Sequence, residues 1–226
     1  MIRFKNVTKL YPPNIVGVEG VSLHVKPGEF VSIVGKSGTG KSTLAKLLFA
    51  EERPTRGTIE IGGWDITNIN DRDISLLRRQ IGVVFQDFKL LPKKTVYENV
   101  AFALQVAGVG SHRIREVVPR VLEIVNLHEK HDRYPKQLSG GEQQRVSIGR
   151  ALVHSPKILI ADEPTGNLDT LNAREITELL SKINEFGTTV VLVTHDREMV
   201  NRLRRRVITL EHGKIISDVE EGRYKL

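Results

Sequence analysis

A short glycine-rich stretch, from Gly35 to Ser42, places the strongest constraint on how this chain can fold. It reads Gly-Lys-Ser-Gly-Thr-Gly-Lys-Ser, which matches the phosphate-loop pattern of Gly, four residues, Gly, Lys and Ser. An apolar run over 31–34 precedes it and leucines at helical spacing follow it, so the sequence predicts a strand, the loop and a helix in that order. In such a loop the glycines close around phosphate groups, and the first N–H groups of the helix point at them.

Two residues at the end of this loop carry specific chemistry. Lys41 supplies a positive charge that can reach the outermost phosphates, and the hydroxyl of Ser42 is a natural magnesium ligand. A glycine-rich turn that binds nothing is the alternative, and the correctly placed strand and helix argue against it. The residues expected to contact nucleotide are Gly35, Lys36, Ser37, Gly38, Thr39, Gly40, Lys41, Ser42 and Thr43.

Apolar runs that each end in a polar residue recur along the chain. Because parallel strands of an open sheet bring their carboxyl ends to one edge, we expect those polar residues to meet there. Helical patterns separate the runs, so the sequence predicts an α/β fold with a mainly parallel sheet. The runs are 31–34, 81–85, 158–161 and 190–193, and they lead into the phosphate loop, Gln86, Asp162-Glu163 and Thr194-His195 respectively.

The adjacent acids Asp162 and Glu163 follow one of these runs. On an extended backbone neighbouring side chains point in different directions, so the two carboxylates can hold different roles. We expect Asp162 to orient magnesium through its water shell and Glu163 to act as the general base for the attacking water. An N-cap or a surface acid at a strand end is the alternative interpretation.

Gln86 and His195 are weaker candidates when each is taken alone. A histidine after a strand is more often a hydrogen-bonded loop residue than a catalytic one, and an isolated glutamine carries little information. Their common position at strand ends raises the expectation for both. We therefore expect Gln86 to ligate magnesium or the attacking water, and His195 to hydrogen-bond the terminal phosphate.

A second candidate anion site begins about a hundred residues after the first. Ser139-Gly140-Gly141 opens a predicted helix, so this helix also presents its N-terminus to an anion. The motif it belongs to consists of Leu138, Ser139, Gly140, Gly141, Glu142 and Gln143. This motif resembles the signature motif of ATP-binding-cassette (ABC) ATPases. The other motifs follow the order and spacing of the same family: the phosphate loop, the Gln86 loop, Asp162-Glu163 and His195.

The resemblance covers essentially the whole chain and implies a shared active site. In that family the signature Ser and Gly, here Ser139 and Gly141, contact a nucleotide held by the phosphate loop of a second subunit. It implies a head-to-tail homodimer around two ATP molecules with Mg²⁺. By the same resemblance Tyr11 would stack on adenine, with ordinary surface packing as the alternative, and Asp169 would lie at the dimer seam.

Within the family, the chain is most similar to the ATP-binding subunits of cell-division complexes. The similarity rests on 86–92, 95–101 and 161–169. It implies an integral membrane partner whose regulation of cell-wall hydrolases is driven by ATP. An ATPase of a lipoprotein-release or macrolide exporter is the alternative. A soluble ABC protein that acts on ribosomes or DNA is disfavoured, because the chain has neither two cassettes nor a long coiled-coil insertion.

The length of 226 residues suits one ABC ATPase domain over 1–226. Helical spacing of apolar residues predicts a helical insertion over roughly 87–150, between two parts of the sheet. The N-terminal segment and 58–61 are expected to add antiparallel strands.

Charge and hydropathy indicate where such a domain acts. The sequence has no run of about 20 apolar residues, no signal-peptide pattern and no cysteine, so we expect a peripheral protein at the cytoplasmic face of the cell membrane. The net charge of +7 includes a cluster at Arg202, Arg204, Arg205 and Arg206. The first interpretation of this cluster is a solvated face, and the second is contact with an anionic membrane surface. Nucleic-acid binding is disfavoured, because no aromatic residues that could stack on bases lie between these arginines.

Overall fold

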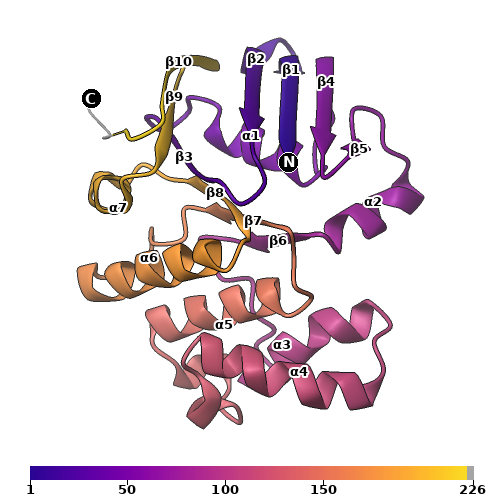
Figure 1. Cartoon of the computed structure of the whole chain (residues 1–226), viewed down its shortest axis with the longest axis vertical. Coiled ribbons are helices and arrows are strands. Elements are labelled where there is room, and N and C mark those ends of the chain that lie inside the picture. The colour runs from indigo at the N-terminus through magenta and orange to yellow at the C-terminus, as the bar shows by residue number, and fades with distance from the viewer. Residues whose placement is uncertain (223–226) are drawn as a thin grey trace.

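Two β-sheets form the framework of the computed structural model, which describes residues 1–222 (Figure 1). The first is antiparallel, with strand order β2-β1-β4-β5, and the second has order β10-β9-β3-β8-β7-β6. In the second sheet all neighbours are parallel except β10 on β9. The antiparallel strands are β1 (Ile2–Tyr11), β2 (Ile15–Val25), β4 (Arg56–Ile61) and β5 (Trp64–Asp65). The others are β3 (Phe30–Val34), β6 (Ile81–Val84), β7 (Ile158–Asp162), β8 (Thr189–Val193), β9 (Arg206–Glu211) and β10 (Lys214–Val219).

The burial pattern of each strand follows from its place in these sheets. Every residue of β3 and β8 is buried, because structure covers both faces of the parallel sheet. In β2 the residues from Gly20 to Val25 largely alternate between exposed and buried, because only one face of the antiparallel sheet meets the core. The four predicted strands and the N-terminal antiparallel strands are thus confirmed.

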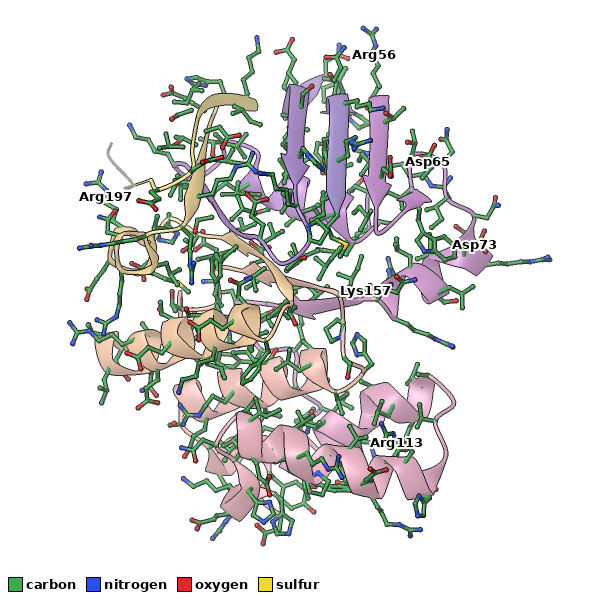
Figure 2. The ribbon with its side chains drawn as sticks, viewed as in Figure 1. Arg56, Asp65, Asp73, Arg113, Lys157 and Arg197 are labelled. Carbon is green, nitrogen blue, oxygen red and sulfur yellow. The ribbon has the colours of Figure 1, made fainter. Side chains whose placement is uncertain are left out.

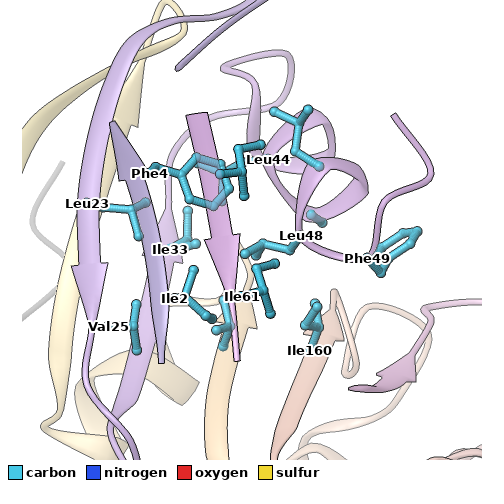
Figure 3. Close-up of a cluster of buried hydrophobic side chains, with 14 of the residues drawn as sticks. Ile2, Phe4, Leu23, Val25, Ile33, Leu44, Leu48, Phe49, Ile61 and Ile160 are labelled. Atoms are coloured by element: carbon cyan, nitrogen blue, oxygen red, sulfur yellow. The ribbon is translucent and has the colours of Figure 1, made fainter. Parts of the chain in front are cut away.

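One apolar core lies between the two sheets and includes helix α1 (Lys41–Leu48). Figure 3 shows Ile2 and Phe4 of β1 in this core together with Ile33 and Ile160 of the parallel sheet. Helix α1 contributes Leu44, Leu47 and Leu48, all of which are at most 1% exposed. The helix that leaves the phosphate loop is therefore held by both sheets.

A second core covers the opposite face of the parallel sheet and is mostly helical. It includes α6 (Thr170–Glu185) and three helices that lie in sequence between β6 and β7 (Figure 1). These three are α3 (Val96–Val106), α4 (Ser111–Ile124) and α5 (Gly140–Leu152), and the short 3₁₀ helices η1 (His128–Lys130) and η2 (Pro135–Gln137) connect α4 to α5. Helices α2 (Asp71–Arg78) and α7 (Arg197–Leu203) complete the chain.

One expectation about buried residues differs from the structure. The spacing of Leu171, Ile176, Leu179, Leu180 and Ile183 predicts one helical face, but Leu171 is 67% exposed, because it lies in the first turn of α6 and about 140° around the helix from Ile176. The sequence allows Val96 and Val100 either to line a groove for a partner or to belong to the core, and the structure buries both in the second core. Within residues 1–222, no helix combines the length and the apolar character that a bilayer crossing needs.

Candidate nucleotide-binding site

A cleft of about 680 Å³ lies at the carboxyl edge of the parallel sheet. Eleven of the expected site residues line it, although they come from segments as far apart in the chain as β1 and the loop after β8. These residues are Tyr11, Lys36, Ser37, Gly38, Gly40, Lys41, Ser42, Thr43, Gln86, Glu163 and His195. Gly35 and Thr39 belong to the loop without lining the cleft.

The phosphate loop leaves the first donors of α1 without a side-chain cap. Its N-cap residue is Gly40, at φ 101°, and a Cβ there would lie 2.2 Å from the carbonyl oxygen of Gly17. Only glycine fits this combination of left-handed backbone and close approach. The Nζ of the buried Lys41 donates to the carbonyls of Gly35 and Lys36 at 2.8 and 3.0 Å, so the loop closes around its own lysine. The loop therefore has the uncapped N–H groups and the cation that a phosphate needs.

Glu163 is held in place by the segment that follows β8. Strand β7 ends at Asp162, and Glu163 has a left-handed backbone with φ 48°, so the expected extended conformation at this residue is wrong. Its carboxylate accepts from the Thr194 hydroxyl at 3.2 Å and from the His195 amide at 3.3 Å. The Nδ1 atom of His195 lies 2.8 Å from its Oε1. The left-handed turn thus aims Glu163 at the loop after β8, where three groups fix its position.

The carboxylate of Asp162 is partly buried and suited to bind a cation. Burial first, and then the neighbouring charge of Glu163, raise the pKa of its carboxyl to about 6, although Lys41 acts in the opposite direction. Its Oδ1 atom is buried and has no hydrogen-bond partner among the described residues. A buried carboxylate oxygen in this condition is the kind of donor that Mg²⁺ prefers, and the loop offers a second oxygen donor in the Ser42 hydroxyl.

Gln86 is fixed against the segment that follows Glu163. Its backbone carbonyl accepts from Asn167 Nδ2 at 3.0 Å, and its Nε2 lies 3.4 Å from Asn167 Oδ1. A Cβ on Gly166 would lie 2.8 Å from the same Nε2, so the glycine makes room for the side chain. The amide of Gln86 therefore lies in the cleft with its position set by residues about 80 further along the chain.

Tyr11 stands at the mouth of the cleft, beside apolar residues that the sequence reasoning missed. Ile15 and Val16 line the same cleft and are 62% and 45% exposed, which is unusual for side chains of this kind. The ring of Tyr11 packs over Gly17, since a Cβ there would lie 2.9 Å from its Cε2. The turn that joins β1 to β2 thus presents an apolar surface on which a flat base could rest. Its signal in the sequence was the apolar pair after Pro12-Pro13.

The signature residues lie outside this cleft. Leu138 to Gln143 contribute nothing to its lining, and they form the start of α5 instead. Ser139 caps this helix: its hydroxyl accepts from the Glu142 amide at 3.3 Å, and its own amide donates to the Glu142 carboxylate at 2.8 Å. Gln143 donates back to the carbonyl of Leu138 at 3.2 Å, and Gly140 lies against Leu168.

Gly141 and Asp169 meet at a common neighbour, Asn172 of α6. A Cβ on Gly141 would lie 1.8 Å from Asn172 Oδ1. Asp169 caps α6 by accepting from the amide of Asn172 at 2.9 Å and from its Nδ2 at 2.6 Å, and these hydrogen bonds lower the pKa of the Asp169 carboxyl. The start of α5 and the expected seam residue are therefore adjacent on one surface.

A family profile described as ABC transporter matches residues 18–166, which is more than half of the chain. The chain belongs to the ABC transporter family. Curated relatives of this ABC protein include the cell division ATP-binding protein FtsE of Bacillus subtilis, 51% identical over 99% of this chain and 98% of that protein. FtsE of Escherichia coli is 46% identical over 95% of this chain and 97% of its own length.

Solved structures agree with the sequence comparison. The ATP-binding cassette MJ0796, in a dimeric post-hydrolysis state bound to ADP and Pi, has a TM-score of 0.88 and 37% identity, covering 99% of this chain and all of that one. CbiO1 of Clostridium perfringens, part of the ABC transporter complex CbiONQ, has a TM-score of 0.90 at 30% identity, covering 97% of this chain and 88% of that one. The expected ABC ATPase fold and the similarity to FtsE proteins are confirmed.

One member of the arginine cluster of this ABC ATPase, Arg206, is held inside the structure by ion pairs. Arg206 is half-buried and pairs with Glu29 at 2.9 Å and with Asp218 at 2.6 Å, and Arg202 pairs with Glu178 at 3.2 Å. Figure 2 shows charged side chains over the whole outline, with Arg56 at one end of the molecule and Arg113 at the other. Arg206 therefore links β9, β10 and the residues before β3, whereas Arg202, Arg204 and Arg205 are exposed.

Proposed function

We propose that this chain is the ATP-hydrolysing subunit of a membrane complex of the FtsE/FtsX type, located at the cytoplasmic face of the cell membrane. Two copies would close head to tail around two ATP molecules, and the closure would drive an integral membrane partner of FtsX type during cell division. The relatives named FtsE support the role, and the cassette MJ0796, solved as a dimer, supports the assembly. One observation carries the proposal. The signature residues at the start of α5 do not line the cleft of their own chain, so a nucleotide in that cleft would meet them only from a second copy.

The groups in the cleft can divide the hydrolysis of ATP among them. Lys41 and the uncapped amides of α1 would bind the phosphates, and the apolar turn at Tyr11 would hold the adenine. Glu163, oriented by Thr194 and His195, would take a proton from the attacking water. His195 would then also contact the terminal phosphate, because its Nδ1 is directed to Glu163 and its other ring nitrogen remains for a ligand.

The donor set fits Mg²⁺. Ser42 and Gln86 would ligate the ion directly, and Asp162 would hold it through water, which removes the unfavourable isolation of a buried carboxylate. When bound, the ion would neutralise charge on the phosphate oxygens. The protein would contribute to magnesium binding by orienting these three side chains.

The trans contact would complete the site. Ser139 and Gly141 would meet the ATP held by the phosphate loop of the second copy, with Asp169 at the seam beside them. A helix N-terminus stabilises an anion by about 0.3–1 kcal/mol at an exposed position, and more when water is excluded. Closure around ATP therefore adds favourable contacts that a single copy lacks.

The membrane partner would bind a groove of about 490 Å³ between α2 and α3. Its lining includes Phe102 and Val106, which are 38% and 68% exposed, together with the cations Arg78 and Arg79. An amphipathic segment with an apolar centre and acidic flanks suits this combination of apolar wall and positive rim. The contact would then lie partly on α3, which packs against α5, the helix that begins with the signature motif.

Recovery of the membrane partner tests the proposal. Affinity-tagged chain is purified from solubilised membranes, and the bound integral membrane proteins are identified by mass spectrometry. We expect a partner with four membrane spans and a large external loop, and we expect Val106→Glu to lose it while nucleotide binding is retained. Phe186→Glu is the matched control, because Phe186 is 89% exposed and lies outside the groove. Recovery of a permease, or of ribosomes or DNA alone, would contradict the FtsX-type assignment.

A further inference from the structure

The signature helix carries an acid at the end where it is expected to receive a phosphate. Glu142 is the third residue of α5, and its carboxylate already accepts a hydrogen bond from the Ser139 amide at 2.8 Å. Lys130, from the 3₁₀ helix η1, donates from Nζ to the same carboxylate. The hydrogen bond from the Lys130 ammonium holds the pKa of the Glu142 carboxyl below its usual range.

An unpaired Glu142 would oppose the binding of ATP at this helix. Its side chain is 15% exposed, so its charge is only partly screened by water, and it lies within one turn of Ser139 and Gly141. A triphosphate that approached the same amides would meet a like charge, which cancels part of the favourable field of the helix N-terminus. Neutralisation by Lys130 leaves the amides of α5 as the dominant feature that an anion encounters.

Other cations near this helix end do not replace Lys130. Arg145, one turn further along α5, is committed to Glu175 at 2.6 Å. Lys136 lies on η2, three residues before Ser139, and no ion pair joins it to any residue of the described range 1–222. Lys130 is thus the cation that this carboxylate contacts.

The backbone around Lys130 is held by a different helix. The first amides of α3 donate to the segment that follows η1: Val96 to the Arg133 carbonyl at 2.8 Å and Tyr97 to the His131 carbonyl at 2.9 Å. These bonds satisfy N–H groups that a helix start otherwise leaves unpaired. They hold the backbone that follows Lys130 against α3, and α3 packs on α5. The lysine side chain itself is half exposed.

We propose that Lys130 is a positioning residue for the trans nucleotide contact. By pairing with Glu142 it keeps the N-terminus of α5 receptive to the triphosphate held by the second copy. The inference rests on the proposed function, because it needs the ATP-closed dimer. Lys130 acts only through Glu142 and does not touch the nucleotide.

ATP-driven dimerisation of the purified chain tests this role. All variants are made in a Glu163→Gln background to prevent turnover, and the dimer fraction is measured by light scattering against ATP concentration. We expect Lys130→Ala to raise the ATP concentration for half-maximal dimerisation by about three- to ten-fold. Affinity of the single copy for a fluorescent ATP analogue should change by less than about two-fold, because the phosphate loop is remote from the pair.

Rescue separates charge neutralisation from a structural effect. Lys130→Arg should behave like the parent, and Lys130→Ala should have no effect in a chain that also carries Glu142→Gln, because no charge is left to neutralise. Lys136→Ala is the matched control and should also have no effect. Equal impairment of Lys130→Ala with and without Glu142→Gln, or an equal effect of Lys136→Ala, would overturn the proposal. If the Glu163→Gln parent forms no dimer with ATP, alone or with its membrane partner, the shared-site function fails as well.

Discussion

The two helix N-termini that we expect to bind phosphate, those of α1 and α5, differ in how their first amides are hydrogen-bonded. The start of α1 has Gly40 as its N-cap and no side-chain cap, and it surrounds Lys41 with backbone carbonyls. The start of α5 is capped by Ser139 and Glu142, which satisfy each other's backbone amides. The first therefore has unsatisfied donors and a cation for an anion, whereas in the second the amides of Ser139 and Glu142 are already bonded, and only those of Gly140 and Gly141 have no partner among the described residues.

Because of this difference, we expect phosphate to bind more strongly at the start of α1 than at the start of α5. A phosphate at α1 gains new hydrogen bonds and a direct charge pair, each of which is strong when ions are involved. A phosphate at α5 meets fewer unpaired amides, and the nearby Lys130 is already paired with Glu142, so its net gain is smaller. We infer that one copy suffices to bind ATP and that the signature helix responds to ATP already held. The following predictions test this inequality.

The largest effect is expected from Glu163→Gln. Loss of a positioned general base should lower kcat by roughly 10²- to 10⁴-fold while ATP remains bound, so the ATP-bound dimer should accumulate. Phosphate release at saturating ATP measures it. Glu178→Gln is the control, because Glu178 forms only a surface pair with Arg202. Undiminished turnover in the Glu163 variant would show that Glu163 is not the general base, and the Thr194 and His195 contacts would then have no catalytic role.

Removal of the loop cation should be the next largest effect. Lys41→Ala should weaken nucleotide binding by about 10- to 100-fold, because a charge-assisted hydrogen bond contributes roughly 1.5–3 kcal/mol. Titration of a fluorescent ATP analogue into the single copy measures the loss. Lys46→Ala removes a cation from the same helix, where it pairs with Glu51 at 3.3 Å, and should change binding little. Equal losses in the two variants would show that general charge, rather than the loop, binds nucleotide.

A methyl group at Gly141 should disturb the signature end without touching the cleft. Gly141→Ala places its Cβ against the Asn172 side chain, which Asp169 holds at 2.6 Å, so we expect about 1–3 kcal/mol lower free energy of unfolding. Urea unfolding gives that value, and single-copy nucleotide affinity should stay unchanged. Gly110→Ala is the control, since a Cβ there has nothing within 4 Å. A loss of nucleotide affinity in the Gly141 variant would break the separation of the two ends.

The smallest effect compares two capping boxes of the same chemistry. Ser139 on α5 and Thr95 on α3 each accept from the amide three residues on, so Ser139→Ala and Thr95→Ala should each lower the free energy of unfolding by about 0.5–2 kcal/mol. Thermal unfolding checks this equality. Only Ser139→Ala should also raise the ATP concentration needed for dimerisation. If Thr95→Ala raises it equally, the Ser139 effect is one of stability and not of ligand contact.

Local patterns in the sequence were sufficient for the elements and for the loop chemistry. The phosphate loop could be predicted because its glycines, lysine and flanking elements lie within a few residues of one another, where backbone sterics and hydrogen bonding decide the outcome. The same holds for the buried strands, because continuous apolar runs are what a sheet covered on both faces needs. The ABC family assignment depended on these motifs and their order.

Only the tertiary structure decided which of those motifs meet. Strand order β3-β8-β7-β6 differs from the order along the chain, and it brings Glu163 to His195 and Gln86 to Asn167. The left-handed turn at Glu163 and the contact of Lys130 with Glu142 also have no local signature, because they depend on where separate segments pack. The sequence therefore determined the chemistry of each group, whereas the packing of segments remote along the chain determined its partners, since side-chain hydrogen bonds and ion pairs form only at distances of a few ångströms.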